Sequence, residues 1–173
     1  PPPPRPAPAR FRKPASLPPS DRLEDWKLLA THPNWSQGFG VWEPGEAGAA
    51  KHLARFETEA ARYAERRDLP SEVGTSNLSP HLHFGELSPR QVWHGLSDGA
   101  GDKFRRELAW RDFSRSVSAS DPNIGSRDQR PIGISNRTGP AAEADFIAWG
   151  RGLTGYPIVD AGMRQMTASG WMH

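Results

Sequence analysis

Apolar residues recur at helical spacing in several stretches of the chain, and the clearest of these spans residues 46–67. Its apolar positions fall at i, i+3, i+7 and i+10, and they are Leu53, Phe56, Ala60 and Tyr63. Side chains at this spacing line one face of an α-helix, so the stretch predicts a helix with one buried stripe. Pro70 and Gly74 follow and are expected to end it.

Two Ser-Pro pairs mark further helix starts. Ser79-Pro80 and Ser88-Pro89 each place a good N-cap residue directly before a proline. Proline is favoured at the first helical position because its missing N–H and fixed φ cost nothing there. A helix is therefore predicted to begin at each pair.

Four more helices are predicted from spacing and end signals, over residues 20–29, 102–118, 141–149 and 158–168. In the second of these, Leu108, Phe113 and Val117 are expected to face inward. Gly150 and Gly170 are expected to close the last two. No stretch shows the alternation of a half-buried strand, so the predicted fold class is all-α.

The remaining stretches are rich in proline, glycine and small polar residues. Residues 1–19 are interpreted as a proline-rich linker with polyproline II character. Residues 31–45 and 121–140 are expected to be loops, the first held to the body of the protein by its three aromatic residues, Trp35, Phe39 and Trp42.

Composition narrows the function classes. The 173 residues carry a net charge of +2 and no cysteine, which excludes a disulfide scaffold, a thiolate metal site and a cysteine nucleophile. No apolar run approaches the roughly 20 residues that span a bilayer, and the N-terminus lacks the apolar core of a signal peptide. We expect a cytoplasmic protein with no membrane partner.

The first candidate site lies just before a predicted helix. Residues 75–79 offer three hydroxyls next to that helix start. A helix N-terminus with unpaired backbone N–H groups is suited to phosphate or pyrophosphate. A plain capping turn has the same composition and is common, so this segment alone favours the turn.

The second candidate is one stripe of the helix at 102–118, formed by Phe104, Glu107, Trp110 and Arg111. Aromatic and arginine side chains stack on bases and hold phosphates. A carboxylate among them would have to meet a base edge or a proton. The alternative is a core aromatic stripe flanked by an i,i+4 pair between Glu107 and Arg111, and spacing alone favours it.

Weaker signals come from two other places. Residues 152–160 form a tight entry into a helix, and Asp160 near the helix start suits its dipole. His81 and His83 are two residues apart and fall on different helix faces, so no metal site is expected. We find no nucleophile elbow and no phosphate-binding glycine-rich loop.

Six segments, taken together and in order, resemble the DNA photolyase and cryptochrome family. They are residues 42–46 (WEPGE), 74–82 (GTSNLSPHL), 84–90 (FGELSPR), 106–113 (RELAWRDF), 154–164 (TGYPIVDAGMR) and 170–173 (GWMH). The resemblance implies the first half of a helical FAD-binding domain, over residues 20–173 and truncated at its C-terminus. It also implies that the domain holds FAD in a folded conformation.

The same resemblance implies roles for individual residues. Tyr63 and Phe104 would contact FAD. The FAD phosphates would bind at Thr75, Ser76, Asn77, Leu78 and Ser79. Glu107 and Trp110 would be the catalytic residues that face the damaged pyrimidines. Arg67 and Arg111 would bind DNA together with them.

The implied activity is that of a deoxyribodipyrimidine photo-lyase, which repairs cyclobutane pyrimidine dimers in DNA by light-driven electron transfer from reduced FAD. The enzyme would be monomeric, with a folate or deazaflavin antenna only on a missing N-terminal domain. Glu107 and Trp110 favour repair, since cryptochromes often alter these positions. The alternatives are a cryptochrome-type blue-light photoreceptor that binds FAD without repair, and an inactive helical fragment.

Overall fold

The computed structural model describes residues 1–10, 12–29, 31–97, 99, 101–127 and 137–173. Over these residues the chain is helical and contains no strand, which confirms the all-α prediction. The α-helices are α1 (Glu46–Glu59), α2 (Tyr63–Arg66), α3 (Ser79–Phe84), α4 (Pro89–His94), α5 (Asp102–Ser120), α6 (Pro140–Gly150) and α7 (Pro157–Ser169). The 3₁₀ turns are η1 (Leu23–Trp26), η2 (Gln37–Val41) and η3 (Ala60–Arg62).

Two compact units divide the chain, and each is described by itself. The first comprises residues 1–3, 43–144 and 173, and the second comprises residues 4–42 and 145–172. No helix in the described part of the chain is long and apolar enough to cross a membrane. Residues 1–10 and 12–19 have no regular secondary structure and are exposed.

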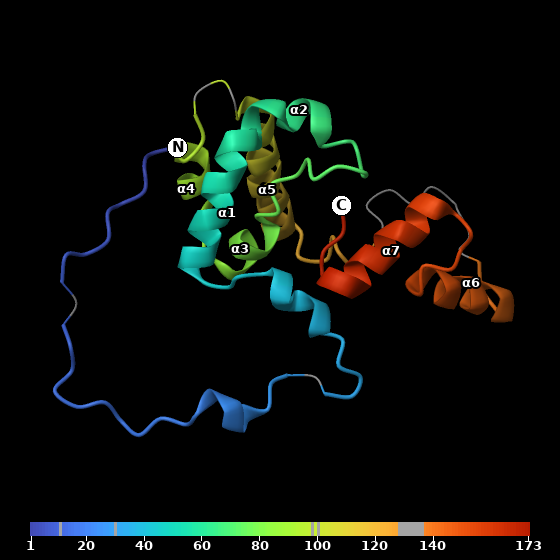
Figure 1. The fold of residues 1–173 in the computed structure, drawn as a ribbon, viewed down its shortest axis with the longest axis horizontal. Helices are drawn as coiled ribbons and strands as arrows, with labels where there is room; N and C mark the ends of the chain where they lie inside the picture. Colours follow the sequence, from blue (N-terminus) through green and yellow to red (C-terminus); the bar gives the residue numbers. More distant parts are fainter. Residues whose placement is uncertain (11, 30, 98, 100, 128–136) are drawn as a thin grey trace. The chain divides into compact units, whose positions relative to one another are not determined.

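The core of the first unit lies where α1 meets α5 through Phe56 and Phe104, and α4 packs against α5; the helices are labelled in Figure 1. It is built from buried apolar side chains: Ala49, Phe56, Ala60, Tyr63, Leu78, Leu87, Val92, Leu96, Phe104 and Leu108. These core side chains come from several segments between residues 46 and 120. They lie on the run from α1 to α2, on the loop at residues 75–79, on the stretch from α3 to α4 and the turn after it, and on α5. Burial of these side chains is the main term that holds the unit together.

The predicted helix over residues 46–67 is present, although it is not one uninterrupted α-helix. It runs as α1, then the 3₁₀ turn η3, then α2. Phe56, Ala60 and Tyr63 are buried, and Leu53 is partly buried, so the predicted stripe is confirmed. The tighter turn at η3 keeps Tyr63 on the core side while the chain changes from one helix to the next.

The two Ser-Pro pairs do not behave alike. Ser88 is the N-cap of α4 and forms a capping box with Gln91, as predicted. Ser79 is not an N-cap: α3 begins at Ser79 itself, after Leu78, whose φ of -86° and ψ of -5° are already helical. The prediction is therefore wrong by one residue, and Pro80 stands at the second helical position.

Helix α5 is longer than predicted, and one of its expected core residues is exposed. Leu108 is buried as expected, and Val117 is half-buried. Phe113 is 58% exposed, which corrects the prediction that it faces inward. The reason is that the core covers only the first half of α5: its buried residues are Phe104 and Leu108, and between residues 112 and 120 only Val117 is not exposed.

The second unit corrects the helix predicted over residues 20–29. Only the short 3₁₀ turn η1 forms, and Leu23, Trp26 and Leu28 remain exposed. A single turn with no buried side chain lacks the tertiary packing that sustains most protein helices. Lys27 ends it in the left-handed region, with φ 50°.

Helix α7 packs against η2 in the second unit. Trp42 Nε1 donates to the Ser169 carbonyl over 2.7 Å, and the Phe39 ring lies against Gly170. These two contacts anchor part of the aromatic loop, as expected. The loop's third aromatic, Trp35, is 58% exposed and stacks edge-on against Phe39.

The ends of α6 and α7 follow the glycine pattern only in part. Gly170 caps α7 in the left-handed conformation, φ 73°, as predicted. Gly150 is the last residue of α6, and the left-handed residue that follows is Gly152, φ 63°. Residues 121–127 and 137–139 form turns and irregular backbone as expected, and residues 128–136 lie outside the described residues.

Candidate functional site

Three aromatic rings meet where α1 and α2 face the start of α5. The Tyr63 ring stands edge-on to Phe104, with centroids 5.2 Å apart, and Phe56 lies 4.6 Å from Phe104. Phe104 and Tyr63 are only 6% and 7% exposed. Burial raises the pKa of the Tyr63 phenol, with Arg67 opposing the shift. Both rings to which the family resemblance assigns a cofactor contact thus belong to one cluster of packed aromatic rings.

Next to this cluster, an ion pair joins the residue after α2 to the middle of α5. Arg67 Nη1 donates to Glu107 Oε1, and the Arg67 guanidinium also lies over the Tyr63 ring, 5.4 Å from its centroid. Both partners are partly exposed, with 27% and 35% of their side chains accessible. Burial opposes the charge of Arg67, but its bond to Glu107 raises the pKa of the guanidinium overall.

Trp110 and Arg111, the other two residues of the α5 stripe, take no part in the aromatic cluster or in the Arg67–Glu107 ion pair. Trp110 is 63% exposed, and its ring packs edge-on against Phe113 at 5.5 Å. Arg111 Nη2 donates to the Leu82 carbonyl over 3.1 Å, while Glu107 bonds to Arg67. The alternative i,i+4 pair between Glu107 and Arg111 is therefore not what this stripe forms. A large exposed aromatic beside a held carboxylate is an arrangement suited to a stacked base.

Gly74 fixes the place where the predicted phosphate-binding loop begins. It is buried, and a Cβ at this position would lie 2.3 Å from the Arg66 carbonyl oxygen and 2.8 Å from Arg66 Cβ. Only a residue without a side chain allows the backbone to pass so close to α2. The loop over residues 75–79 therefore starts in direct contact with the helix that carries Tyr63.

Within the loop, side chains bond to the loop itself. Thr75 Oγ1 donates to Asn77 Oδ1 over 3.1 Å, and Ser76 Oγ accepts from the Leu78 N–H over 3.3 Å. Asn77 adopts φ 54°, a conformation that asparagine tolerates better than most residues. The Leu78 side chain is fully buried, so only its backbone can reach a ligand.

The loop's backbone donors are available. In the described part of the chain, the N–H groups of Thr75, Ser76 and Asn77 have no protein acceptor. Three consecutive free backbone donors ahead of a helix suit an anionic ligand. The plain capping turn, the alternative favoured by the sequence, would have used a Ser79 cap that the structure lacks.

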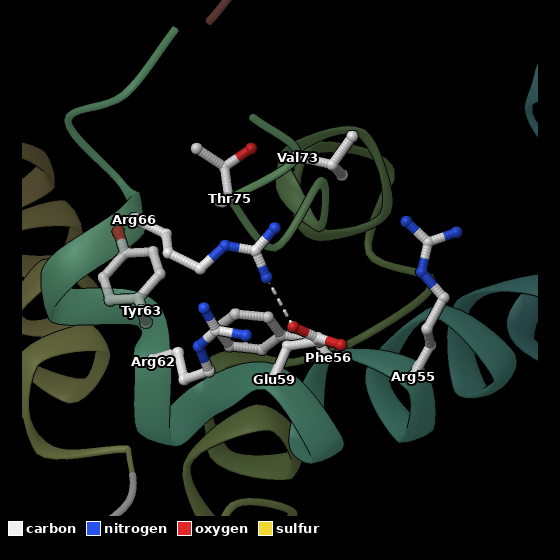
Figure 2. Close-up of a pocket in the computed structure, with 9 residues that line it drawn as sticks. Arg55, Phe56, Glu59, Arg62, Tyr63, Arg66, Val73 and Thr75 are labelled. Carbon is white, nitrogen blue, oxygen red and sulfur yellow. Dashed lines mark hydrogen bonds and ion pairs between the residues drawn. The ribbon is translucent and has the colours of Figure 1, made fainter. Parts of the chain in front are cut away.

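A small pocket borders the same loop (Figure 2). Its lining includes Tyr63, Thr75, Glu59 and three arginines, Arg55, Arg62 and Arg66. Arg66 donates to Glu59 Oε2 and to Glu72 Oε2, both over 2.7 Å. Sequence reasoning missed this cluster, although the arginines share one helical face and the spacing could have indicated it.

A second polar network joins α3 to the start of α1. His81 Nδ1 donates to Glu86 Oε2 over 2.5 Å, and Glu86 Oε1 accepts from the Gly45 N–H over 2.7 Å. The bond to His81, and then that to Gly45, lowers the pKa of the Glu86 carboxyl. His81 is 2% exposed, whereas His83 is exposed. Nothing local in the sequence indicated this long-range tie between α3 and the start of α1.

In the second unit, Asp160 organises the turn before α7. Its carboxylate accepts from Thr154 Oγ1 over 2.6 Å, from the Thr154 N–H over 2.8 Å and from the Gly155 N–H over 3.0 Å. These bonds, that of the Thr154 hydroxyl first, lower the pKa of the Asp160 carboxyl. The residue is 7% exposed, so its role is to close the turn rather than only to face the helix dipole.

Comparison with known proteins identifies the family to which the chain is similar. The family model for the FAD binding domain of DNA photolyase matches residues 104–173. The deoxyribodipyrimidine photo-lyase of Agrobacterium fabrum is 42% identical over 175 residues, which cover 96% of this chain and 36% of that protein. A crystal structure of a bacterial class III photolyase from Agrobacterium tumefaciens superimposes with a TM-score of 0.83 at 40% identity, over 92% of this chain and 35% of that one. The chain belongs to the DNA photolyase and cryptochrome family.

The relatives also include a cryptochrome. Cryptochrome-1 of Arabidopsis thaliana is 36% identical over 150 residues, which cover 77% of this chain and 22% of that protein. The chain spans about a third of the length of the photolyases that it matches. The helical fold is that of part of the photolyase FAD-binding domain, as the sequence predicted.

Proposed function

We propose that this chain forms the phosphate-binding side of an FAD site and the lesion-facing rim of an enzyme that repairs cyclobutane pyrimidine dimers in DNA with light. The observation that carries the proposal is the Arg67–Glu107 ion pair beside Tyr63, with the exposed Trp110 three residues along α5. A carboxylate that is fixed by an ion pair can accept a hydrogen bond from the edge of a base, and an exposed indole beside it can stack on the face of a base.

The residues present fit the phosphate part of FAD. Three free backbone donors at residues 75–77 are chemically suited to a diphosphate, which carries only acceptors. Thr75, Ser76, Asn77, Leu78 and Ser79 would hold the phosphates, the last two through their backbone or hydroxyl groups. Tyr63 and Phe104 would form an apolar wall of the cofactor pocket. When bound and reduced, FAD would supply the photoexcited electron that splits the dimer.

Glu107 would accept a hydrogen bond from, or share a proton with, the edge of the damaged pyrimidines. Arg67 keeps this carboxylate in place through the ion pair between Arg67 Nη1 and Glu107 Oε1. Trp110 would pack against the dimer face and exclude water from it. Arg111, which is tied to the Leu82 carbonyl, would add positive charge at the DNA-facing rim.

The lesion would have to leave the duplex to reach this rim. A damaged, poorly stacked base pays less unstacking energy than an intact one, so flipping itself selects for the lesion. The exposed face of Trp110 can replace part of the stacking that a flipped base loses. Selection would therefore come from the cost of flipping and from the Glu107 contact together.

A cryptochrome-type photoreceptor is the second candidate function. The similarity to Arabidopsis cryptochrome-1 favours it, and Glu107 and Trp110 favour repair. In either case we expect FAD as the cofactor, and an antenna of folate or deazaflavin type only on sequence outside these 173 residues. We also propose that residues 1–19 are a linker to such sequence, and that the protein acts as a cytoplasmic monomer on DNA.

Repair by the longer parent protein tests the proposal. Reduced enzyme would be illuminated with an oligonucleotide that contains one thymine dimer, and dimer loss would be measured. We expect repair by the wild type and at least a tenfold slower rate for Glu107→Ala, about 1.4 kcal/mol in the barrier. Glu65→Ala, on an exposed face of α2, is the matched control. FAD retention without dimer splitting would select the photoreceptor, and an unchanged Glu107→Ala rate would contradict the role of Glu107.

A further inference from the structure

Arg66 contacts both ends of the segment that links α2 to the loop at residues 75–79. Its carbonyl oxygen accepts from the Leu69 N–H over 3.1 Å, so the chain turns back directly after the helix. At the other end of the segment, the Gly74 backbone lies so close that a Cβ on Gly74 would be 2.3 Å from the same carbonyl oxygen. The segment at residues 67–74 therefore begins and ends at one residue.

The side chain of Arg66 holds the same segment from a second direction. Its Nε donates to Glu72 Oε2 and its Nη1 donates to Glu59 Oε2, both over 2.7 Å. Glu59 is the last residue of α1, so the guanidinium joins the segment to α1 as well as to α2. Figure 2 shows the Arg66 side chain between Thr75 and Glu59, where all three line one pocket. The backbone and the side chain of Arg66 thus restrain the same stretch of chain.

A guanidinium is suited to this double contact because it is a planar fork whose donors point in fixed directions. Two carboxylates on separate donors fix the orientation of that fork. The Arg66 side chain is 21% exposed, and those of Glu72 and Glu59 are 41% and 51% exposed. Ion pairs with this much exposure contribute little to global stability. We therefore expect Arg66 to affect the position of the segment more than the folding of the chain.

The contacts of Arg66 argue against direct binding of a phosphate by its guanidinium. The side chain carries one positive charge and its two partners carry two negative charges, so the three groups together are negative. A cluster with that net charge does not attract an anion. Removal of one carboxylate would therefore strengthen anion binding if Arg66 were a ligand, and would weaken it if Arg66 only holds the loop in place.

We propose that Arg66 is a positioning residue for the phosphate-binding loop. Through Glu72 and Glu59 it holds the segment at residues 67–74, and it thereby fixes where the free N–H groups of residues 75–77 lie. This inference rests on the proposed function only in taking residues 75–79 as the phosphate site. Arg66 itself contacts no ligand. Without its side chain, the free N–H groups lose the place that the contact between the segment and the two helices gives them.

Titration calorimetry of the 173-residue chain with ADP measures this effect. Arg66→Ala should weaken ADP binding about threefold to fivefold, a limit set by the modest strength of partly exposed ion pairs. Arg62→Ala is the matched control, because Arg62 is an exposed arginine of the same pocket and the variant removes the same charge. Its effect should stay below about twofold. Arg66→Lys should recover only part of the affinity, because an ammonium lacks the planar fork.

The carboxylate partner gives the sharper test, because charge and position act in opposite directions. Glu72→Ala removes a negative charge near the loop, which by electrostatics alone would tighten ADP binding. We expect it to weaken ADP binding instead, about twofold to threefold. Glu65→Ala removes the same charge from an exposed position of α2 and should leave binding unchanged or slightly tighter. In the Arg66→Ala background, Glu72→Ala should not weaken binding further, because the contact is already lost.

Amide chemical shifts of residues 74–76, measured by NMR, report the position of the loop without any ligand. Arg66→Ala and Glu72→Ala should both move these signals, and the two control variants should not. Unmoved signals, tighter ADP binding by Glu72→Ala, or equal losses of affinity in Arg66→Ala and Arg62→Ala would each overturn the inference. Failure of the proposed function looks different: the wild-type chain would bind no ADP, while the amide signals would still move in Arg66→Ala.

Discussion

Arg67 and Glu107 are 40 positions apart in sequence and form an ion pair between the end of α2 and the middle of α5. The pair lies against Tyr63, whose ring the Arg67 guanidinium covers at 5.4 Å. One contact thus joins the wall of the proposed cofactor pocket to the carboxylate proposed to meet the lesion. Loss of Arg67 or Glu107 should therefore affect both the wall of the cofactor pocket and the lesion contact.

A double-mutant cycle measures this pair. Arg67→Ala and Glu107→Ala should each destabilise the chain by about 1 kcal/mol, since the pair is only partly buried. The coupling energy between them, from urea unfolding of both single variants and the double variant, should be about 0.5–1 kcal/mol. Additive effects would show that the ion pair contributes nothing to stability. Arg67→Lys should recover only part of the coupling, because lysine lacks the planar fork.

Trp110 should matter for ligand binding and not for folding. Because the ring is 63% exposed, Trp110→Ala should change the free energy of unfolding by less than about 1 kcal/mol. The same change should weaken binding of a dimer-containing oligonucleotide about tenfold, as expected for loss of one stacking platform. Trp26→Ala, which removes another indole that is 58% exposed, is the control and should leave DNA affinity as it is. Equal affinities of the two variants would contradict the role of Trp110.

Gly74 should be indispensable for the position of the loop at residues 75–79. Gly74→Ala would bring a methyl group within 2.3 Å of the Arg66 carbonyl oxygen, so we expect a destabilisation of about 1–3 kcal/mol in urea unfolding. Affinity for ADP, measured by calorimetry, should fall as the loop moves away from α2. Gly125→Ala, where no atom lies within 4 Å of the added methyl group, should have neither effect.

Acid should unfold the first unit partly through Glu86. Its bond to His81, and then that to Gly45, lowers the pKa of the folded carboxyl below its ordinary value of 4.5. Because the pKa of Glu86 is lower in the folded state than in the unfolded state, its carboxylate stabilises the fold at a pH above the unfolded-state pKa. This stabilisation is lost as the pH falls through the folded-state pKa. Urea unfolding between about pH 6 and about pH 3 should therefore show a shallower loss for Glu86→Gln than for the wild type. Glu65→Gln should keep the wild-type slope.

Local pattern predicted much of the first unit correctly. Burial of Phe56, Ala60 and Tyr63 could be predicted from the sequence because the residues on a buried helix face repeat with a fixed period. The helix start at Ser88 could be predicted because a capping box depends only on two residues that are three positions apart, here Ser88 and Gln91. Phe113 was misassigned for the opposite reason: periodicity identifies a face of α5 but not how far its neighbours extend along it.

The candidate site depended on contacts that spacing cannot reveal. Arg67 and Glu107 were both singled out, but the sequence offered Glu107 a partner at i+4, and the structure pairs it across 40 positions instead. Gly74 was taken as a helix stop, whereas its main constraint is the approach of the Arg66 backbone. Such requirements arise from tertiary packing, which overrides local preference.

The central claim is that these residues form the phosphate side of an FAD site, and ligand choice tests it most directly. Equilibrium dialysis of the 173-residue chain would compare FAD, ADP and riboflavin. Because the free N–H groups at residues 75–77 suit a diphosphate, we expect FAD and ADP to bind saturably and riboflavin, which has no phosphate, to bind at least tenfold more weakly. Riboflavin binding as tightly as FAD, or no binding of either phosphate ligand, would contradict the account.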